Sequence, residues 1–206
     1  EIKEDKWLED KTSKTRAKHI AFWEAYAERL KSLKIVDPSC GSGAFLVAAF
    51  DYLEAEGMRV NKELERLHAP RLFSNWDREI LKNNLYGVDL SPEAAEITRL
   101  SLWLKIAKNK EKLVALDHNI RAGNAVVKDS EYADVLAFDW TTAFPEIMDE
   151  GGFDIVIGNP PYVRHELIKE IKPALKSDFE TYVGTADLFV YFYELGHKIL
   201  KENGYL

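Results

Sequence analysis

The segment from Lys34 to Phe45 constrains the fold more than any other part of the chain, because it reads as a strand, a glycine-rich turn and the start of a helix. Asp37 places a carboxylate at the carboxyl end of the strand, where ligands bind in open α/β sheets. Gly41 and Gly43 allow the backbone to come close to a ligand. The helix that follows carries apolar residues at helical spacing: Phe45, Leu46, Ala49, Phe50 and Leu53.

This glycine-rich turn does not match the motifs that bind pyrophosphate. The dinucleotide fingerprint requires a third glycine at the position where this chain has Leu46, and the sequence contains no P-loop motif. A nicotinamide-dependent enzyme is therefore disfavoured. By itself the turn is only weak evidence for a cofactor site.

A second informative segment runs from Asp154 to Tyr162, where a short apolar strand ends in an Asn-Pro-Pro-Tyr turn. The two prolines stiffen the backbone and supply no N–H donors. Asn159 offers an acceptor and a donor, and Tyr162 offers a flat aromatic face. Together they suit a planar group that bears an exocyclic amine. The alternative is a rigid turn after a strand, in which Asn159 acts only as a cap.

Two further strands also end in polar side chains. Strand 85–90 reaches Asp89, after which Ser91-Pro92 opens a helix with an N-cap and a proline at its first position. An acidic residue at the end of the second strand of such a unit typically binds ribose hydroxyls, and the alternative is that Asp89 caps a turn. A strand near 119–123 closes on Asn124. The order and spacing of these segments predict an α/β fold.

The pattern between these strands predicts helices and no internal repeat. We expect strands at 33–37, 85–90, 119–123 and 153–158, helices at 43–56, 92–108 and 187–202, a helical insertion at 57–84 and a variable loop at 163–184. Gly204 is expected to stop the last helix. The chain divides into an N-terminal helical segment, residues 1–32, and a partial catalytic domain, residues 33–206. Four apolar side chains of helix 92–108 are expected to face the sheet: Ile97, Leu100, Leu104 and Ile106.

With these motifs the chain resembles the S-adenosylmethionine-dependent DNA adenine-N6 methyltransferases, and most closely the methylase region of fused, Eco57I-like (type IIG) restriction-modification enzymes. The resemblance covers roughly residues 19–206. It implies a Rossmann-like methyltransferase sheet with flanking helices. It also implies a set of cofactor-binding residues: Asp37, Pro38, Cys40, Gly41, Gly43, Phe45, Asp89, Leu90 and Asn124. The position of Asn124 often carries Asp in the family, but an amide can still accept a hydrogen bond from the cofactor's amine.

The resemblance further implies that Asn159, Pro160, Pro161 and Tyr162 form the catalytic turn. Asn159 and the Pro160 carbonyl would accept the two hydrogens of adenine N6, and Tyr162 would stack on a base flipped out of the duplex. The implied cofactor is S-adenosyl-L-methionine. The implied partner is double-stranded DNA, held by a target-recognition domain absent from this chain, in the cytoplasm of a bacterium or archaeon.

Other readings stay open on the sequence alone. A protein-glutamine methyltransferase, or an RNA guanine enzyme, uses a similar Asn-Pro-Pro-Tyr turn. A non-catalytic module that binds the cofactor or a partner subunit is a third possibility. The Asp-Pro-Ser-Cys-Gly-Ser-Gly loop and the insertion at 57–84 favour the DNA enzyme.

The expected number of strands indicates a fragment of a larger enzyme. The resemblance implies seven strands in the order 3-2-1-4-5-7-6, whereas the sequence suggests four strands and the start of a fifth at Tyr205-Leu206. We therefore expect an open sheet edge beside the strand that ends at Gly158. Weak or absent cofactor binding and no methyl transfer are expected from residues 1–206 alone.

Composition excludes several kinds of site. The net charge of −7 argues against this chain gripping DNA alone, although Arg164, Lys169, Lys172 and Lys176 make the loop after the catalytic turn locally basic. The single cysteine excludes an internal disulfide, and the five histidines lack metal-ligand spacing, so we expect no metal. No apolar run is long enough to span a membrane. The Glu-x-Lys pattern recurs too often in this charged chain to assign a nuclease.

Overall fold

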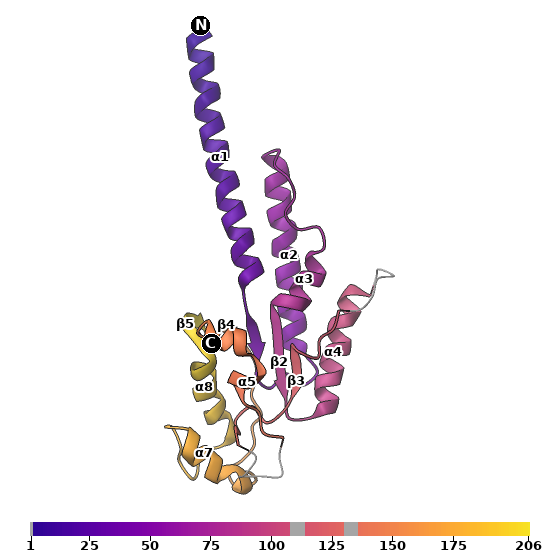
Figure 1. Cartoon of the computed structure of the whole chain (residues 1–206), viewed down its shortest axis with the longest axis vertical. Coiled ribbons are helices and arrows are strands. Elements are labelled where there is room, and N and C mark those ends of the chain that lie inside the picture. Colours follow the sequence, from indigo (N-terminus) through magenta and orange to yellow (C-terminus); the bar gives the residue numbers. More distant parts are fainter. Residues whose placement is uncertain (1, 108–113, 130–135) are drawn as a thin grey trace.

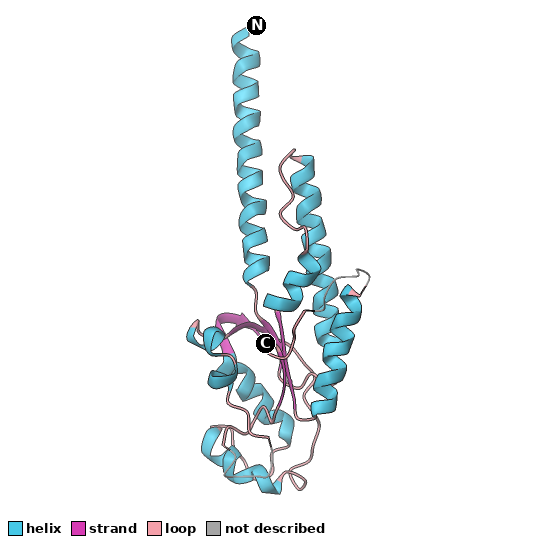
Figure 2. Ribbon diagram, turned by 45° about the vertical axis from the view of Figure 1, so that its right-hand side comes forward, coloured by secondary structure: helices cyan, strands magenta, loops and turns pink. Residues whose placement is uncertain are grey.

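The computed structural model describes residues 2–107, 114–129 and 136–206, with side chains from Thr12 onward. Its centre is a five-stranded parallel sheet in the order β3-β2-β1-β4-β5 (Figures 1 and 2). The strands are β1 (Ile35–Asp37), β2 (Leu85–Asp89), β3 (Ile120–Ala122), β4 (Phe153–Val156) and β5 (Leu200–Tyr205). The predicted α/β fold is confirmed.

Helices cover both faces of this sheet, because successive strand residues point to opposite sides. Ile35 and Leu85 pack in a core cluster with α1 to α4, whereas Val36 and Tyr86 pack in a second cluster with α5 to α8. The first group comprises α1 (Ile2–Ser32), α2 (Ala44–Arg66), α3 (Trp76–Asn83) and α4 (Pro92–Ile106). The second comprises α5 (Trp140–Ala143), α6 (Pro145–Asp149), the 3-10 turn η2 (Lys169–Ile171), α7 (Lys172–Asp178) and α8 (Leu188–Ile199).

The N-terminal helix α1 ends at Ser32, the residue at which the sequence placed a boundary. Ala27 and Leu30 nevertheless pack in the same core cluster as β1 and α2. Figure 1 shows α1 and α2 extending beyond one end of the sheet, while α7 lies at the opposite end. The division into two domains at residue 32 stays a prediction.

Helix α2 is longer than predicted, since it continues to Arg66 instead of ending at residue 56. The expected insertion at 57–84 is therefore the second half of α2, a connection and α3. Gly57 lies in the middle of α2 because the indole of Trp76 packs against it. A Cβ at Gly57 would lie 2.3 Å from Trp76 Cδ1. The Trp76 Nε1–H also donates to Leu53 O at 2.6 Å, which fixes α3 on α2.

Helix α4 turns a different face to the sheet from the one predicted. Ile97, Leu100 and Leu104 are 49%, 48% and 73% exposed, so the expectation that they face the sheet is wrong, and of the four only Ile106 is buried. The buried positions are Ala95, Thr98, Leu102 and Ile106. Thr98 faces inward because its hydroxyl donates to Gly41 O at 2.9 Å. The predicted end of this helix, at residue 108, lies outside the described residues.

The C-terminal end corrects two further predictions. Helix α8 ends at Ile199, and β5 begins at Leu200, so Gly204 does not stop a helix and the fifth strand does not start at Tyr205. Asn203 has φ 64° within β5, where the β4–β5 register is irregular. Asn-Gly reads as a stop in sequence, but here these residues form a bulge in a strand.

Strand β5 also covers the side of β4 that the sequence predicted to be an open edge. β4 pairs with β1 on one side and with β5 on the other. The expected open edge beside the strand leading to Gly158 is therefore wrong, and the edge lies at β5.

Two buried amides join helix ends to strand starts. Asn84 Nδ2 donates to Leu30 O at 2.9 Å and to Leu33 O at 2.7 Å, between α1 and β1. Asn119 Nδ2 donates to Lys82 O and Leu85 O, both at 3.1 Å, between α3 and β2. Each amide thus satisfies carbonyl groups that a helix end leaves without partners.

We expect Asn84→Ala to lower the free energy of unfolding by about 1–3 kcal/mol, because several buried carbonyls would lose their donor. Asn83→Ala is the matched control, since the neighbouring Asn83 side chain is exposed and bonds only to Glu79. Its effect should stay within about 0.5 kcal/mol. Urea unfolding of both variants measures the difference, and equal stabilities would contradict the assigned role of Asn84.

Candidate active site

The polar residues singled out in the sequence lie at one edge of the sheet. The sheet is parallel, so the carboxyl ends of its strands meet at the same edge. Asp37 and Asp89 are the last residues of the adjacent strands β1 and β2. Asn124 follows β3, and the Asn159–Tyr162 turn follows β4. This is the edge expected for ligand binding in an α/β sheet.

The loop between β1 and α2 is tied to β2 by hydrogen bonds. The Gly41 N–H donates to Asp89 Oδ2 at 2.8 Å, and the Ser91 N–H donates to Asp89 Oδ1 at 2.9 Å. The Cys40 N–H donates to Val88 O at 2.9 Å. The Asp89 carboxylate therefore caps a turn, as the alternative reading proposed, and it also holds the glycine-rich loop. Each of its oxygens retains a further lone pair for a ligand.

The two glycines of this loop have different roles. Gly43 has φ 83°, and a Cβ there would lie 3.0 Å from the Thr98 side chain, so its close approach is to α4. Gly41 has φ 54°, and a Cβ there would meet no heavy atom within 4 Å. Among the two, only Gly41 borders open space that a ligand could fill.

The Asp37 carboxyl is the most deeply buried ionisable group at this edge, with 1% of its surface exposed. Its pKa is raised to about 6, chiefly because burial disfavours the charged form. The hydrogen bond from the Ser39 N–H opposes this rise, and the nearby negative charge of Asp89 adds to it. Within the described residues, Asp37 forms no ion pair. A carboxylate in this setting favours a ligand that carries positive charge.

Cys40 is a buried packing residue. Burial raises the pKa of its thiol to about 12, which favours the neutral thiol at physiological pH. Its Sγ lies 3.7 Å from Thr98 Oγ1 and next to Gly87, where a Cβ would come within 3.1 Å. The side chain thus points into the core, and only the backbone of Cys40 belongs to the loop surface.

Asn124 is held by its own turn. Its Oδ1 accepts from the Val126 N–H at 3.3 Å, and its backbone N–H donates to Leu136 O at 2.6 Å. The Gly123 N–H donates to Asp89 O at 2.8 Å, which places the end of β3 beside the end of β2. Leu90, next to Asp89, is largely exposed at the same edge.

Gly158 links the Asn159–Tyr162 turn to β1, and the sequence did not identify it as a functional residue. A Cβ at this position would lie 2.7 Å from Asp37 Oδ1. The Ile157 N–H donates to Val36 O at 2.9 Å, which keeps the end of β4 beside β1. A side chain at residue 158 would therefore separate the two segments. The signal in the sequence was a glycine directly before the turn.

A cavity of about 440 Å³ lies where these two segments meet. Pro38, Ser39 and Phe45 line it from the β1 side, and Gly158 and Pro160 line it from the β4 side. Its other walls include Ile157, Phe192, Tyr193 and Leu206. Of the predicted site residues, only Pro38, Phe45 and Pro160 line this cavity. The others do not: Asp37, Cys40, Gly41, Gly43, Asp89, Leu90, Asn124, Asn159, Pro161 and Tyr162. The loop between β1 and α2 and the segment that follows β4 therefore line the same cavity.

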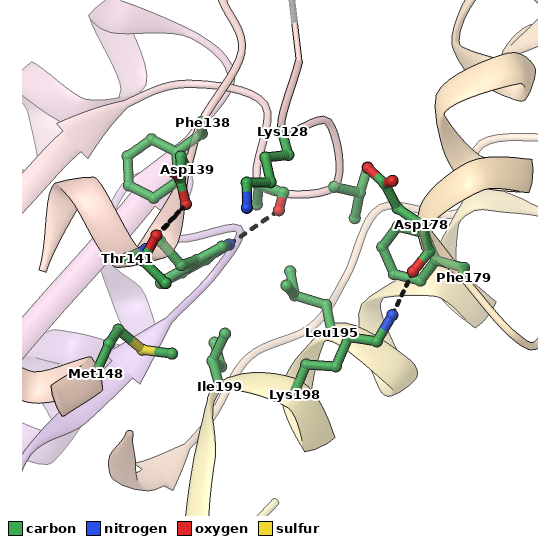
Figure 3. Close-up of a pocket in the computed structure, with 13 residues that line it drawn as sticks. Lys128, Phe138, Asp139, Thr141, Met148, Asp178, Phe179, Leu195, Lys198 and Ile199 are labelled. Carbon is green, nitrogen blue, oxygen red and sulfur yellow. Dashed lines mark hydrogen bonds between the residues drawn. The ribbon is translucent and has the colours of Figure 1, made fainter. Parts of the chain in front are cut away.

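A second cavity, of about 350 Å³, lies between α5 and α8 (Figure 3). Its floor is apolar, and Lys128, Asp139, Asp178 and Lys198 lie around it with opposite charges. None of the predicted site residues lines it.

No group of three or more His, Cys, Asp or Glu side chains is placed to hold a metal ion in the described part. No helix among the described residues is long and apolar enough to cross a membrane.

Curated proteins with similar sequences are restriction-modification enzymes and DNA methyltransferases. The chain is 30% identical over 195 residues to the type II restriction enzyme and methyltransferase RM.Eco57I of Escherichia coli, covering 84% of this chain and 19% of that protein. It is 28% identical over 184 residues to the type II methyltransferase M.BstVI of Geobacillus stearothermophilus, covering 87% and 28%. It is 28% identical over 190 residues to the adenine-specific methyltransferase PglX of Streptomyces coelicolor, covering 77% and 15%. The chain thus spans less than a third of each of these relatives.

Solved structures share the fold. The type IIL restriction-modification enzyme MmeI, determined in complex with DNA, matches with a TM-score of 0.59 and 22% identity over 95% of this chain and 26% of that one. A nuclease-deletion mutant of the type ISP enzyme LlaGI, bound to a DNA substrate mimic, matches with a TM-score of 0.50 and 19% identity over 84% and 15%.

The family model described as the Eco57I restriction-modification methylase matches residues 83–206, more than half of the chain. This match includes β2 to β5, Asp89 and the Asn159–Tyr162 turn. Together with the identity to RM.Eco57I, it confirms the resemblance inferred from the motifs. The chain belongs to the Eco57I restriction-modification methylase family.

Proposed function

We propose that this chain is part of a DNA adenine-N6 methyltransferase that uses S-adenosyl-L-methionine and acts in a restriction-modification system. The observation that supports this most is the close packing of residue 158 against Asp37, which brings Pro38 of the glycine-rich loop and Pro160 of the Asn159–Tyr162 turn to one cavity. A methyl donor and an acceptor base must meet at such a junction. The adenine-specific methyltransferase PglX among the relatives supports adenine as the acceptor.

The residues at the carboxyl edge fit this cofactor. The open space at Gly41 leaves room for a ligand against the backbone. The buried Asp37 carboxyl would hold and balance a positively charged group, and Asp89 would accept hydrogen bonds from ribose hydroxyls. Asn124 would contact the adenine ring at the end of β3. When bound, S-adenosyl-L-methionine supplies a methyl group whose transfer from sulfonium to N6 leaves a neutral thioether and releases one proton from the nitrogen.

The turn after β4 would prepare the acceptor nitrogen. Adenine N6 is a poor nucleophile because its lone pair is delocalised into the ring. Asn159 Oδ1 and the Pro160 carbonyl would accept its two hydrogens and favour a tetrahedral nitrogen. Tyr162 is 76% exposed, so its ring offers a free face to a flipped base. Stacking of this kind is worth about 1–3 kcal/mol per base.

The loop after the turn is the surface of this chain that we expect to approach DNA. Arg164, Lys169 and Lys176 are exposed there, whereas Lys172 is partly buried and its Nζ donates to Gly184 O at 2.7 Å. Since the whole chain carries a net charge of −7, we propose that another part of the intact protein provides most contacts with DNA phosphates. The DNA complexes of MmeI and LlaGI support DNA as the partner.

The first prediction concerns the open space at Gly41. Gly41→Ala should weaken S-adenosyl-L-methionine binding by about tenfold or more, which is about 1.4 kcal/mol, because the methyl group would occupy that space. Gly151→Ala is the matched control, since Gly151 also has a positive φ, of 96°, and only Lys201 Cγ, 3.9 Å away, within reach of a Cβ. Calorimetric titration of the intact protein compares the two. Equal affinities would contradict the placement of the cofactor at Gly41.

The second prediction concerns the buried charge of Asp37. Its pKa is about 6 in the folded protein against an ordinary value of 3.8, so the folded state binds this proton more tightly. Stability should therefore fall as the pH rises from about 4 to 6, and the loss, up to about 3 kcal/mol, should persist above pH 6. Asp37→Asn should remove this loss and stabilise the free protein at pH 7, while weakening cofactor binding. Urea unfolding across this pH range tests it, and parallel curves for the two proteins would refute the burial argument.

The third prediction concerns the catalytic turn in the intact protein. Asn159→Ala should lower kcat by about 100-fold or more and leave cofactor affinity nearly unchanged, because the amide contacts only the acceptor. Tyr162→Ala should impair capture of the flipped base, and Tyr162→Phe should be milder because stacking survives. Methyl-transfer kinetics on duplex DNA measure these effects. If Phe loses as much activity as Ala, Tyr162 acts through its hydroxyl instead.

A further inference from the structure

The catalytic turn makes few contacts of its own. Asn159 and Pro161 are exposed, and Tyr162 is 76% exposed. Two of its four residues are prolines, which have no N–H to donate. The backbone bond that closes the turn runs from the Val163 N–H to Pro161 O at 3.0 Å. The position of the turn relative to the sheet must therefore be fixed by the segments on either side.

On its distal side the turn is attached to the beginning of α8. The Leu188 N–H donates to Val163 O at 2.9 Å. The His165 N–H donates to Asp187 Oδ1, also at 2.9 Å. Asp187 stands at the N-cap of α8, where an Asp carboxylate ordinarily accepts from an N–H of its own helix, but here it makes no such bond. Its carboxylate instead binds the chain 22 residues earlier.

A second contact reaches the tyrosine ring itself. The ring centroid of Phe189 lies 5.7 Å from that of Tyr162, with the planes tilted by 46°. On its other side Phe189 contacts Tyr193 at 6.4 Å, nearly edge to face. The Tyr162 ring is therefore supported by α8 while most of its surface remains exposed.

Helix α8 itself is packed in the hydrophobic core. Tyr191, Phe192, Leu195 and Ile199 are buried in the core cluster on this face of the sheet, and the helix continues directly into β5. A side chain attached to α8 is thus fixed relative to β4 and β1. Contacts from α8 to the turn transmit that rigidity to Tyr162 and, through it, to Asn159.

We propose that Asp187 and Phe189 are positioning residues for the catalytic turn: Asp187 anchors the backbone at His165, and Phe189 supports the ring of Tyr162. This assignment rests on the proposed methyltransferase function. Neither residue touches the reacting atoms. Their effect is to keep Asn159 and Tyr162 where a flipped base would enter, since a misplacement of about 1 Å can cost about 100-fold in rate.

Glu194 provides a matched control for Asp187. It lies on the same helix and holds the far end of the same loop, accepting from the Glu180 N–H at 2.9 Å and the Thr181 N–H at 2.8 Å. Glu194→Ala therefore removes a comparable carboxylate anchor without releasing the turn. A purely structural role would make the two alanine variants alike.

The experiment measures kcat, the KM for DNA, cofactor affinity and thermal stability in the intact protein. Asp187→Ala should lower kcat by about 10- to 100-fold and leave cofactor affinity nearly unchanged. Asp187→Asn should restore most of kcat, because its amide oxygen can accept the same N–H. Phe189→Ala should lower kcat, and Phe189→Tyr should keep it. Glu194→Ala should lower the Tm but retain kcat.

Hydrogen exchange gives a readout that does not require turnover. The His165 amide should be protected in the wild type and in Asp187→Asn, and should exchange at least about tenfold faster in Asp187→Ala. Wild-type kcat in Asp187→Ala, or an equal loss of kcat in Asp187→Ala and Glu194→Ala, would overturn this assignment alone. A wild-type protein that transfers no methyl group to DNA would overturn the proposed function, and this assignment with it.

Discussion

The approach of Gly158 to Asp37 is the constraint on which the site depends. β4 leaves the sheet beside β1, and residue 158 has no room for a side chain, because its Cβ would lie 2.7 Å from Asp37 Oδ1. This close packing brings Pro38 and Ser39 of the glycine-rich loop and Pro160 of the Asn159–Tyr162 turn to a single cavity. Two segments more than a hundred residues apart thereby form one site. A larger residue at 158 would separate the proposed donor and acceptor positions.

The residues of the site lower the free energy of unfolding, and the surrounding core offsets this loss. The site combines a buried carboxyl with a raised pKa and two glycines in left-handed conformations. The loop that contains them is secured by Asp89, Thr98 and backbone bonds to β2. Apolar clusters on both faces of the sheet hold those partners in place. A cationic ligand at Asp37 would remove part of the cost, so ligand binding and stability should be coupled.

The features predicted correctly from the sequence are those that short local patterns encode, above all the strands of the sheet. Apolar runs that end in Asp37, Asp89 and the Asn159 turn gave the strands and their common edge, because parallel strands align their carboxyl ends. The inward position of Thr98 was missed, since its partner, Gly41 O, lies 57 residues earlier in the chain. The sequence placed Asp187 at the start of a helix, but it could not show that the Asp187 carboxylate accepts from the His165 N–H, 22 residues earlier.

The start of β5 and the length of α2 were missed for the same kind of reason. Asn203 and Gly204 favour a helix stop locally, but pairing with β4 draws them into a strand. A glycine normally weakens a helix. At Gly57, however, the indole of Trp76 packs where a side chain would be. Each error arises where a contact between distant parts of the chain overrides a local preference.

The identity of the methylated product tests the central claim most directly. The intact protein would be incubated with unmethylated duplex DNA and S-adenosyl-L-methionine carrying a deuterated methyl group, and the DNA would then be digested to nucleosides for mass spectrometry. The account predicts deuterated N6-methyldeoxyadenosine, lost in Asn159→Ala. Deuterium found only on deoxycytidine, or no deuterated nucleoside at all, would contradict it.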